Sequence, residues 1–269
     1  MTIDSILLQM KTEFESAIIE KGATAQTSLI RSQKLINILH NQVKEEFINL
    51  NVPSCSIYPP LGYCNPEVKI SGLLKSKDQD ICIIPNSIPQ SQIVINRTKA
   101  KLLDMNNIET VITVNIRSQL SSLAKNIDTL YERTFAEALN LHLRHPKQCL
   151  GEVYLIPTHE YDTNAMKNNK IKYRKVNKLE DYIKKFQYVN SRNYDLGQEY
   201  KYERVCLLIV DFRQEQPKLY STANELKADG LISQNSTVSM DNLAFNTFAR
   251  DLLCTYQARF GDTCCIIES

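Results

Sequence analysis

Apolar residues recur with helical spacing at the start of the chain and predict two helices there. From about Ile3 to Glu20 they return every three or four positions, and Gly22 follows as a C-terminal stop. A second helix is predicted over about Ser28 to Asn49, with one broad apolar face suited to packing along a sheet. Four prolines between positions 53 and 66 then predict an irregular connection.

Shorter apolar runs in the middle of the chain predict strands. The segments EVKISGLL and QDICIIP flank a turn-like KSKD, which predicts a β-hairpin over roughly Glu67 to Pro85. With the turn centred near Ser76–Lys77, Asp80 is expected to face Gly72 or Leu73. A third strand is predicted in ETVITVNIRS (109–118), which is rich in β-branched residues.

Helices and strands then alternate along the rest of the chain. A long helix is predicted from about Ser122 to Arg144, with Ser121 or Ser122 as its cap and Pro146 as its stop. Strands are predicted at GEVYLIP (151–157) and RVCLLIVDF (204–212), and a last helix at about 240–259. The core order is helix, three strands, helix, strand, which predicts a mixed α/β (α+β) domain whose central mixed sheet is flanked by helices.

This order resembles the core of the PD-(D/E)XK nuclease superfamily over about Ser28 to Pro157. Two segments, PPLGYCNPEVKISGLLKSKDQDICIIP and RSQLSSLAKNIDTLYERTFAEALNLHLRHPKQCLGEVYLIP, are also similar to the central block of type II restriction endonucleases. The resemblance implies an acidic residue in the second strand and an acidic-x-lysine triplet in the third. It implies one nuclease domain over 1–269, with a catalytic core at 28–157 and C-terminal additions at 158–269 that contact DNA or form a dimer.

Asp80 matches the acidic position of the second strand. It enters the apolar ICII run, where an unpaired carboxylate is costly unless a metal or another cation compensates its charge. Mg²⁺ prefers such oxygen ligands, neutralises a phosphodiester and lowers the pKa of the attacking water. We therefore interpret Asp80 as a metal ligand. The alternative is that Asp80 only closes the turn at Lys75–Asp78.

The third strand departs from the superfamily pattern. Alternation places Thr113, Asn115 and Arg117 on one face, where the acidic-x-lysine triplet is expected. Asn115 can offer a neutral carbonyl to a metal. Arg117 can stabilise charge on the scissile phosphate but is a poor proton acceptor. A second carboxylate must therefore come from elsewhere in the chain.

We predict that Glu132 supplies this second carboxylate as a metal ligand. The superfamily resemblance allows a ligand from the helix after the third strand, and Lys125, Asp128 and Glu132 share a face there. Lys125 is then expected to orient or activate the attacking water, whereas an exposed salt-bridged face is the alternative. Glu137 lies about 140° further round the helix, so we assign it another role.

The literal triplet Glu67-Val68-Lys69 is the other candidate for the missing carboxylate and lysine. The predicted turn places Lys69 four residues from the position opposite Asp80. That separation is roughly 13 Å at about 3.3 Å per residue, which is too far to share a metal. We therefore reject this triplet.

Two regions carry side chains suited to DNA. The loop after the third strand offers groups that can bond base edges and phosphates, although a capped helix start is the alternative. A basic tract with interleaved tyrosines spans Lys167 to Arg204 and suits a phosphate backbone, with a solvated insertion as the alternative. The predicted DNA contacts are Arg117, Ser118, Gln119, Ser121, Ser122, Lys170, Lys172, Arg174 and Lys175.

Composition bears on charge, on disulfide and metal sites, and on the cellular location of the protein. The net charge of +2 is uninformative as a total, and eight cysteines form no CxxC pair, so reduced structural thiols are expected. His142-x-x-His145 has metal-like spacing but no evident third ligand. The charged first 22 residues do not fit a signal peptide and no membrane-spanning run is present, which predicts a cytoplasmic protein.

These features together predict a type II restriction endonuclease that uses Mg²⁺ to hydrolyse both strands of double-stranded DNA at a short specific site. Symmetric cutting favours a homodimer, and a cognate DNA methyltransferase is expected in the same system. The alternatives are a DNA-binding protein that kept this fold without catalysis, or a repair or defence nuclease that does not select a sequence.

Overall fold

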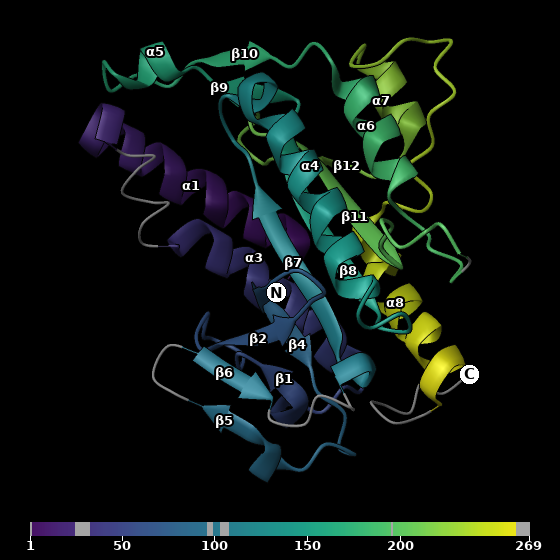
Figure 1. Ribbon diagram of the computed structural model, residues 1–269. Coiled ribbons are helices and arrows are strands. Elements are labelled where there is room, and N and C mark those ends of the chain that lie inside the picture. Colours follow the sequence, from purple (N-terminus) through teal and green to yellow (C-terminus); the bar gives the residue numbers. More distant parts are fainter. Residues whose placement is uncertain (1, 25–32, 96–98, 103–107, 195, 262–269) are drawn as a thin grey trace.

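A mixed six-stranded sheet forms the centre of the molecule in the computed structural model, which describes residues 2–24, 33–95, 99–102, 108–194 and 196–261 (Figure 1). In spatial order its strands are β1 (Ile57–Tyr58), β4 (Ile81–Ile83), β7 (Ile112–Ser118), β8 (Leu150–Pro157), β11 (Arg204–Asp211) and β12 (Lys218–Tyr220). The three long central strands, β7, β8 and β11, run parallel. β4 and β12 pair with them in antiparallel fashion, and β1 pairs antiparallel with β4. This confirms the predicted mixed α/β class.

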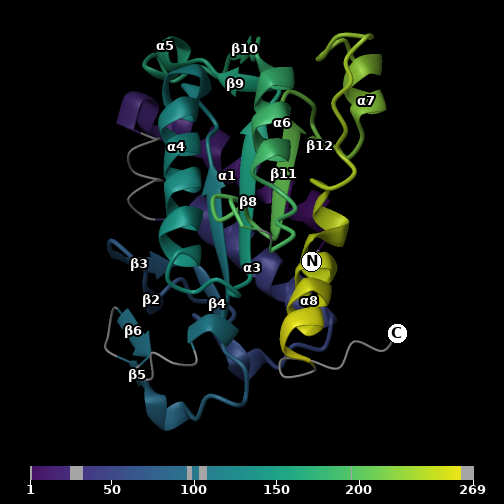
Figure 2. The same ribbon diagram turned by 45° about the vertical axis from the view of Figure 1, so that its right-hand side comes forward.

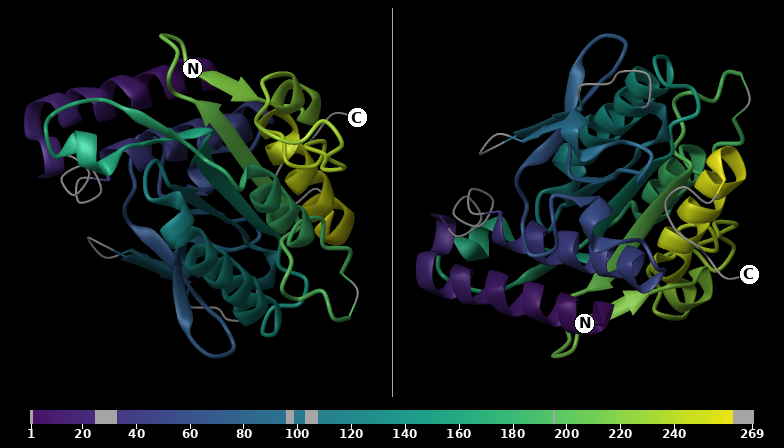
Figure 3. Two further views of the ribbon diagram at one scale, coloured as in Figure 1. Left: turned by 90° about the horizontal axis from the view of Figure 1, so that it is seen from above. Right: turned by 90° about the horizontal axis from the view of Figure 1, so that it is seen from below.

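Helices cover both faces of this sheet (Figures 2 and 3). The helices α1 (Ile3–Lys21), α3 (Lys34–Asn49) and α8 (Phe245–Phe260) pack on one face with Ile112, Val114 and Val153. The helices α4 (Leu123–His142), α6 (Leu179–Tyr188) and α7 (Ala223–Ala228) pack on the other face with Leu150 and Tyr154. Every residue of β8 and β11 is buried because alternate side chains enter the two cores.

Smaller elements surround this core. A four-stranded sheet has the order β3 (Ser76–Gln79), β2 (Glu67–Ser71), β6 (Lys99–Leu102), β5 (Ile93–Ile95). The hairpin of β9 (His159–Tyr161) and β10 (Tyr173–Lys175) encloses the short helix α5 (Thr163–Met166). Single 3-10 turns are η1 (Gly22–Thr24), η2 (Ser54–Ser56), η3 (Gln90–Gln92) and η4 (Ile108–Thr110).

Most predicted elements are present, with shifts at their ends. The first helix, the helix after the third strand and the long strands lie within a few residues of the prediction. The predicted start of the second helix at Ser28 lies outside the described residues, and α8 begins at Phe245 rather than near Met240. The strands β5 and β6 were not predicted because each is only three or four residues long. No helix among the described residues is long and apolar enough to cross a membrane.

The hairpin register differs from the prediction. Ser71 pairs with Ser76 and Val68 with Gln79, so the turn is Gly72–Lys75 and not Ser76–Lys77. Asp80 then separates β3 from β4, and these two strands belong to different sheets. The predicted second strand is therefore interrupted at Asp80, its candidate metal ligand.

Candidate active site

Strand register brings three polar positions side by side on the face of the sheet that α4 covers. Asp80 directly precedes Ile81 of β4, which pairs with Val114 of β7. The residue after Val114 is Asn115, which pairs with Glu152 of β8. Their strand neighbours Cys82, Leu150 and Tyr154 belong to the core beneath α4 and α6. The alternation predicted for the third strand is therefore confirmed, and Asn115 and Arg117 project toward α4.

The Asp80 carboxylate lies at the strand break and replaces a backbone acceptor. Its Oδ2 accepts a hydrogen bond of 2.7 Å from the backbone N–H of Ile116, which holds β7 at the point where β3 has ended. Burial raises the pKa of Asp80 to about 6, and the Ile116 N–H and the charge of Arg117 oppose this rise. Asp80 therefore has a structural contact through one oxygen and an environment that disfavours its charge.

Glu137, from the middle of α4, is the carboxylate that faces this group. Its side chain is 5% exposed and accepts hydrogen bonds from Arg117 Nη2 at 3.0 Å and Asn115 Nδ2 at 3.2 Å. Gln79 Nε2 at 3.2 Å and Lys77 Nζ at 3.3 Å donate to it from the hairpin. One glutamate thus links α4, β7 and β3.

Glu152 completes the group from β8. It is fully buried, and its Oε1 accepts a 2.6 Å hydrogen bond from Arg117 Nε. Its Oε2 is buried and has no hydrogen-bond partner among the residues that the structure describes. Burial raises the pKa of Glu152 to about 7 although Arg117 favours its charged form, and the charge of Glu137 adds to the rise. Arg117 therefore pairs with both Glu137 and Glu152. One oxygen of Glu152 is left without a partner among the described residues.

The donor chemistry of this cluster suits a hard divalent cation. Asp80, Glu137 and Glu152 offer carboxylate oxygens, and the unpartnered Glu152 Oε2 and Gln79 Oε1 are oxygen acceptors inside the same cluster. Within the described residues, no three histidine, cysteine or acidic side chains already stand in a metal-holding arrangement. The guanidinium of Arg117 instead pairs with Glu137 and Glu152, and Lys77 also pairs with Glu137. A cation could therefore be held here only if Arg117 gives up these contacts.

The structure does not bring the predicted metal ligand Glu132, or the predicted water-orienting Lys125, into this group. Both side chains are exposed, and Asp128 on the same helix face pairs with Lys185 of α6. Lys125, Asp128 and Glu132 therefore form the outer face of α4, which was the stated alternative. Glu137, about 140° further round, is the glutamate that enters the site.

A sequence signal for Glu137 existed in the helix pattern. The buried face of α4 carries Leu123, Ile127, Thr134, Ala138 and Leu141, and Glu137 shares that face. An acidic residue on an apolar helix face needs compensating partners, whereas the charges at 125, 128 and 132 can be solvated. The identity of those partners depended on the sheet and could not be obtained from helix periodicity.

The observed turn brings Lys69 of the Glu67-Val68-Lys69 triplet closer to Asp80 than the predicted turn does. Lys69 pairs with Asp78, only two residues from Asp80. Alternation nevertheless turns Lys69 and Asp78 away from Lys77 and Gln79, which are the hairpin side chains that reach Glu137. The lysine that the hairpin supplies to the site is therefore Lys77.

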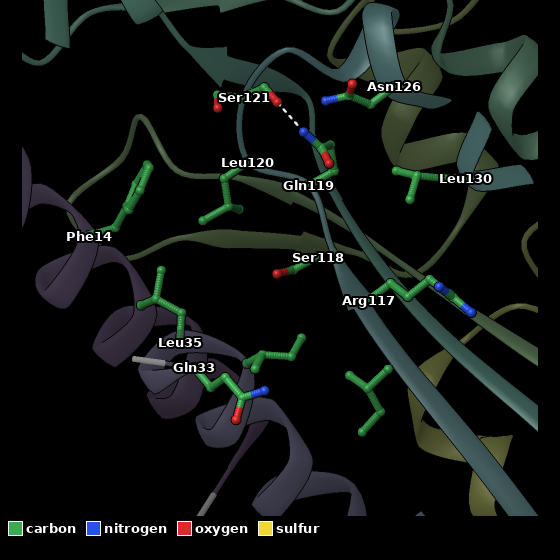
Figure 4. A pocket seen from close by; sticks show the side chains of 12 residues that line it. Phe14, Gln33, Leu35, Arg117, Ser118, Gln119, Leu120, Ser121, Asn126 and Leu130 are labelled. Carbon is green, nitrogen blue, oxygen red and sulfur yellow. Dashed lines mark hydrogen bonds between the residues drawn. The ribbon is translucent and has the colours of Figure 1, made fainter. Parts of the chain in front are cut away.

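The predicted DNA-contacting residues lie in two places. Arg117, Ser118, Gln119 and Ser121 line a cavity of about 400 Å³ beside the carboxylate cluster (Figure 4). Ser122 is the N-cap residue of α4 but makes no side-chain cap, and Glu160 Oε2 accepts from the Leu123 N–H instead, at 2.7 Å. The exposed basic residues on and before β10 are Lys170, Lys172, Arg174 and Lys175.

Other candidate ligands have structural roles. His142 is fully buried and bonds the carbonyls of Glu199 and Gln148, and His145 bonds the carbonyl of Ser71. Cys82 and Cys206 are buried as their apolar runs predict, and Cys149 is buried too. Cys254, which also lies in an apolar run, is exposed, as is Cys55. Cys264 and Cys265 lie outside the described residues. The hydrogen bonds of the two histidines occupy both ring nitrogens of His142 and the Nε2 of His145.

Comparison of the sequence with protein-family models and with curated proteins, and of the structure with solved structures, finds no match. The function of this chain must therefore be argued from its own residues and geometry.

Proposed function

We propose that this chain is a Mg²⁺-dependent nuclease of the PD-(D/E)XK type that hydrolyses phosphodiester bonds of double-stranded DNA at a short specific sequence, as type II restriction endonucleases do. One observation carries the proposal: Asp80, Glu137 and Glu152 come from three different elements to one side of the sheet, around Arg117. Burying several carboxylates together lowers the stability of the fold, and such clusters are therefore candidates for a role in chemistry.

Asp80, Glu137 and Glu152 would hold the metal in this proposal. Bound there, Mg²⁺ supplies charge neutralisation for the phosphate and a water of lowered pKa. The raised pKa values of Asp80 and Glu152 fit carboxylates that lack part of the positive charge they are built to face. Glu137 replaces Glu132 in the set of ligands, and Asn115 positions Glu137 through its amide.

Arg117 has a role in both states of the proposed site. Without DNA its guanidinium bridges Glu137 and Glu152. A phosphodiester offers the same planar guanidinium a bidentate partner, so Arg117 can turn to the phosphate and release the carboxylates to the metal. Lys77, about a quarter exposed and 3.3 Å from Glu137, takes the place assigned to Lys125 as the lysine near the attacking water.

Exposed basic residues outside the site suit a DNA partner. Exposed Lys170, Lys172 and Lys175 on the β9–β10 segment would neutralise phosphates, and Arg174 is held by Glu160. Symmetric cleavage of both strands favours a homodimer with one site per strand. We expect a cognate DNA methyltransferase to be encoded beside such an enzyme, and cytoplasmic DNA to be its substrate.

A DNA-binding protein without catalysis is the second candidate, and the ion pairs of Arg117 favour it. They offset part of the negative charge of the acidic cluster from within the protein, which reduces its need for a metal. A non-specific nuclease would keep the chemistry and lack the sequence selection. The three candidates predict different products from plasmid DNA.

Plasmid cleavage with Mg²⁺ and then with EDTA separates these candidates. Discrete fragments with Mg²⁺ alone support the restriction enzyme, and a smear indicates a non-specific nuclease. Intact plasmid with a retained gel shift would refute the nuclease proposal. Asp80→Asn keeps an acceptor for the Ile116 N–H but removes the charge, so it should abolish cleavage, whereas Asp128→Asn on the outer face of α4 should not. Near-wild-type cleavage by Asp80→Asn would overturn the assignment of this residue.

A further inference from the structure

The cavity beside the carboxylate cluster is not needed by the proposed chemistry. It lies between the end of β7, the start of α4 and the helices α1 and α3 (Figure 4). Its volume of about 400 Å³ falls inside the roughly 300–1,000 Å³ of small-molecule sites. Arg117 and Ser118 are successive residues, so the cavity begins where the candidate active site ends.

Among the described lining residues, one buried polar atom lacks a hydrogen-bond partner. Ser121 is 1% exposed, and its Oγ is that atom. A buried hydroxyl without a partner is unfavourable for folding, so a group that reaches Ser121 would gain from the hydrogen bond that this hydroxyl can make. The backbone carbonyl of Ser121 accepts a hydrogen bond from the Gln119 side chain, which fixes the position of this residue (Figure 4).

The rest of the lining suits a flat, neutral ligand with polar edges. Phe14, Leu35 and Leu130 provide apolar walls, and the amides of Gln119 and Asn126 lie together toward the Ser121 side of the cavity (Figure 4). Arg117 is the one charged side chain among the described lining residues, and its guanidinium is bound to Glu137 and Glu152. A phosphate would therefore find little positive charge inside this cavity.

We propose that the cavity receives a single nucleobase turned out of the DNA duplex next to the phosphate that Arg117 contacts. This inference rests on the proposed function, because it takes DNA as the ligand of Arg117. Apolar side chains would cover the faces of the base, and Gln119, Ser121 and Asn126 would bond its edge. Enzymes that extrude a base bind it in this way, between apolar walls and edge-directed polar groups.

The probe is a set of duplexes that carry 2-aminopurine at single positions through the cleavage site, mapped first from the plasmid fragments. Ca²⁺ replaces Mg²⁺ so that the duplex is bound without being cut. Fluorescence of 2-aminopurine rises when the base leaves the stack, so one position should brighten several-fold on binding and its neighbours should not.

Filling the cavity provides the matched test. Leu130→Phe enlarges a half-buried wall residue, and Leu143→Phe makes the same change at an exposed position after α4. The brightening should fall to less than half with Leu130→Phe and stay unchanged with Leu143→Phe. Asn126→Leu, at a half-buried position on the same wall, gives a second variant if Leu130→Phe does not fold.

The outcomes separate this inference from the proposed function. Specific cleavage with no brightening at any position, or brightening that neither filled variant reduces, would overturn the extruded base and leave the nuclease intact. Plasmid that is never cut would overturn the nuclease, and the extruded base with it. Cleavage with one bright position that depends on the cavity supports both.

Discussion

Two glutamates on one helix give the sharpest test of the site. Glu137 is buried at 5% exposure and accepts hydrogen bonds from Lys77, Gln79, Asn115 and Arg117, whereas Glu132 is exposed on the outer face. Glu137→Gln removes the charge that two cations share and keeps nearly the same shape. The matched Glu132→Gln variant removes the same charge from solvent.

The expected effects follow from these contacts. Hydrogen bonds to charged groups contribute about 1.5–3 kcal/mol each, and those from Lys77 and Arg117 are weakened by the 27% and 23% exposure of these side chains. Because glutamine keeps one acceptor oxygen and Arg117 keeps Glu152, we expect Glu137→Gln to lower the free energy of unfolding by ~2–3 kcal/mol. A domain stable by about 5–15 kcal/mol remains folded after such a loss. Glu132→Gln should change stability by less than about 0.5 kcal/mol.

Urea denaturation measures stability and plasmid cleavage measures activity. Loss of a metal-holding carboxylate should slow cleavage by about 100-fold or more, equivalent to about 2.7 kcal/mol in the transition state. Cleavage by Glu132→Gln should stay within about twofold of the wild type, because exposed substitutions away from a site have small effects. The reasoning is refuted if Glu137→Gln, shown folded by circular dichroism, cuts as fast as the wild type, or if Glu132→Gln is the inactive variant.

Three further predictions concern the metal, a buried ion cluster and the hairpin. With a DNA duplex present, so that Arg117 can leave the carboxylates, non-cleaving Ca²⁺ at about ten times its dissociation constant should stabilise the complex by about 1.4 kcal/mol and raise its melting temperature by a few degrees in a thermal scan; Asp80→Asn should remove this shift. Burial alone would raise the pKa of Glu203, but His142 and Arg259 lower this pKa to about 2. The charged Glu203 therefore stabilises the fold above its ordinary pKa of 4.5, and this stabilisation is lost as pH falls toward 2. Urea denaturation at a series of acid pH values should show this loss, and Glu203→Gln should make stability depend less on pH. Gly72→Ala would place a Cβ 2.8 Å from the backbone oxygen of Asn140, so the hairpin must shift, and we expect a loss of about 1–3 kcal/mol in urea denaturation.

The register of the hairpin could not be predicted from the sequence pattern, and its turn shows why. KSKD resembled a turn by composition, but the chain turns at Gly72–Lys75, where Asn140 of α4 accepts from the N–H groups of Leu74 and Lys75 and donates to the Lys75 carbonyl. Those partners lie 65 residues away in sequence. A tertiary contact selected the turn, and with it the position of every hairpin side chain relative to Asp80.

The sequence by itself determined the mixed α/β class, the helices and long strands, and the face of β7 that carries Asn115 and Arg117. Periodicity records such features because each depends only on residues nearby in the chain. It also marked Asp80, because a carboxylate beside an apolar run is conspicuous. The tertiary structure decided which acids meet. Glu137 and Glu152 face Asp80 only because β4, β7 and β8 pair in their observed register beneath α4, and the balance between solvation and pairing keeps Glu132 outside.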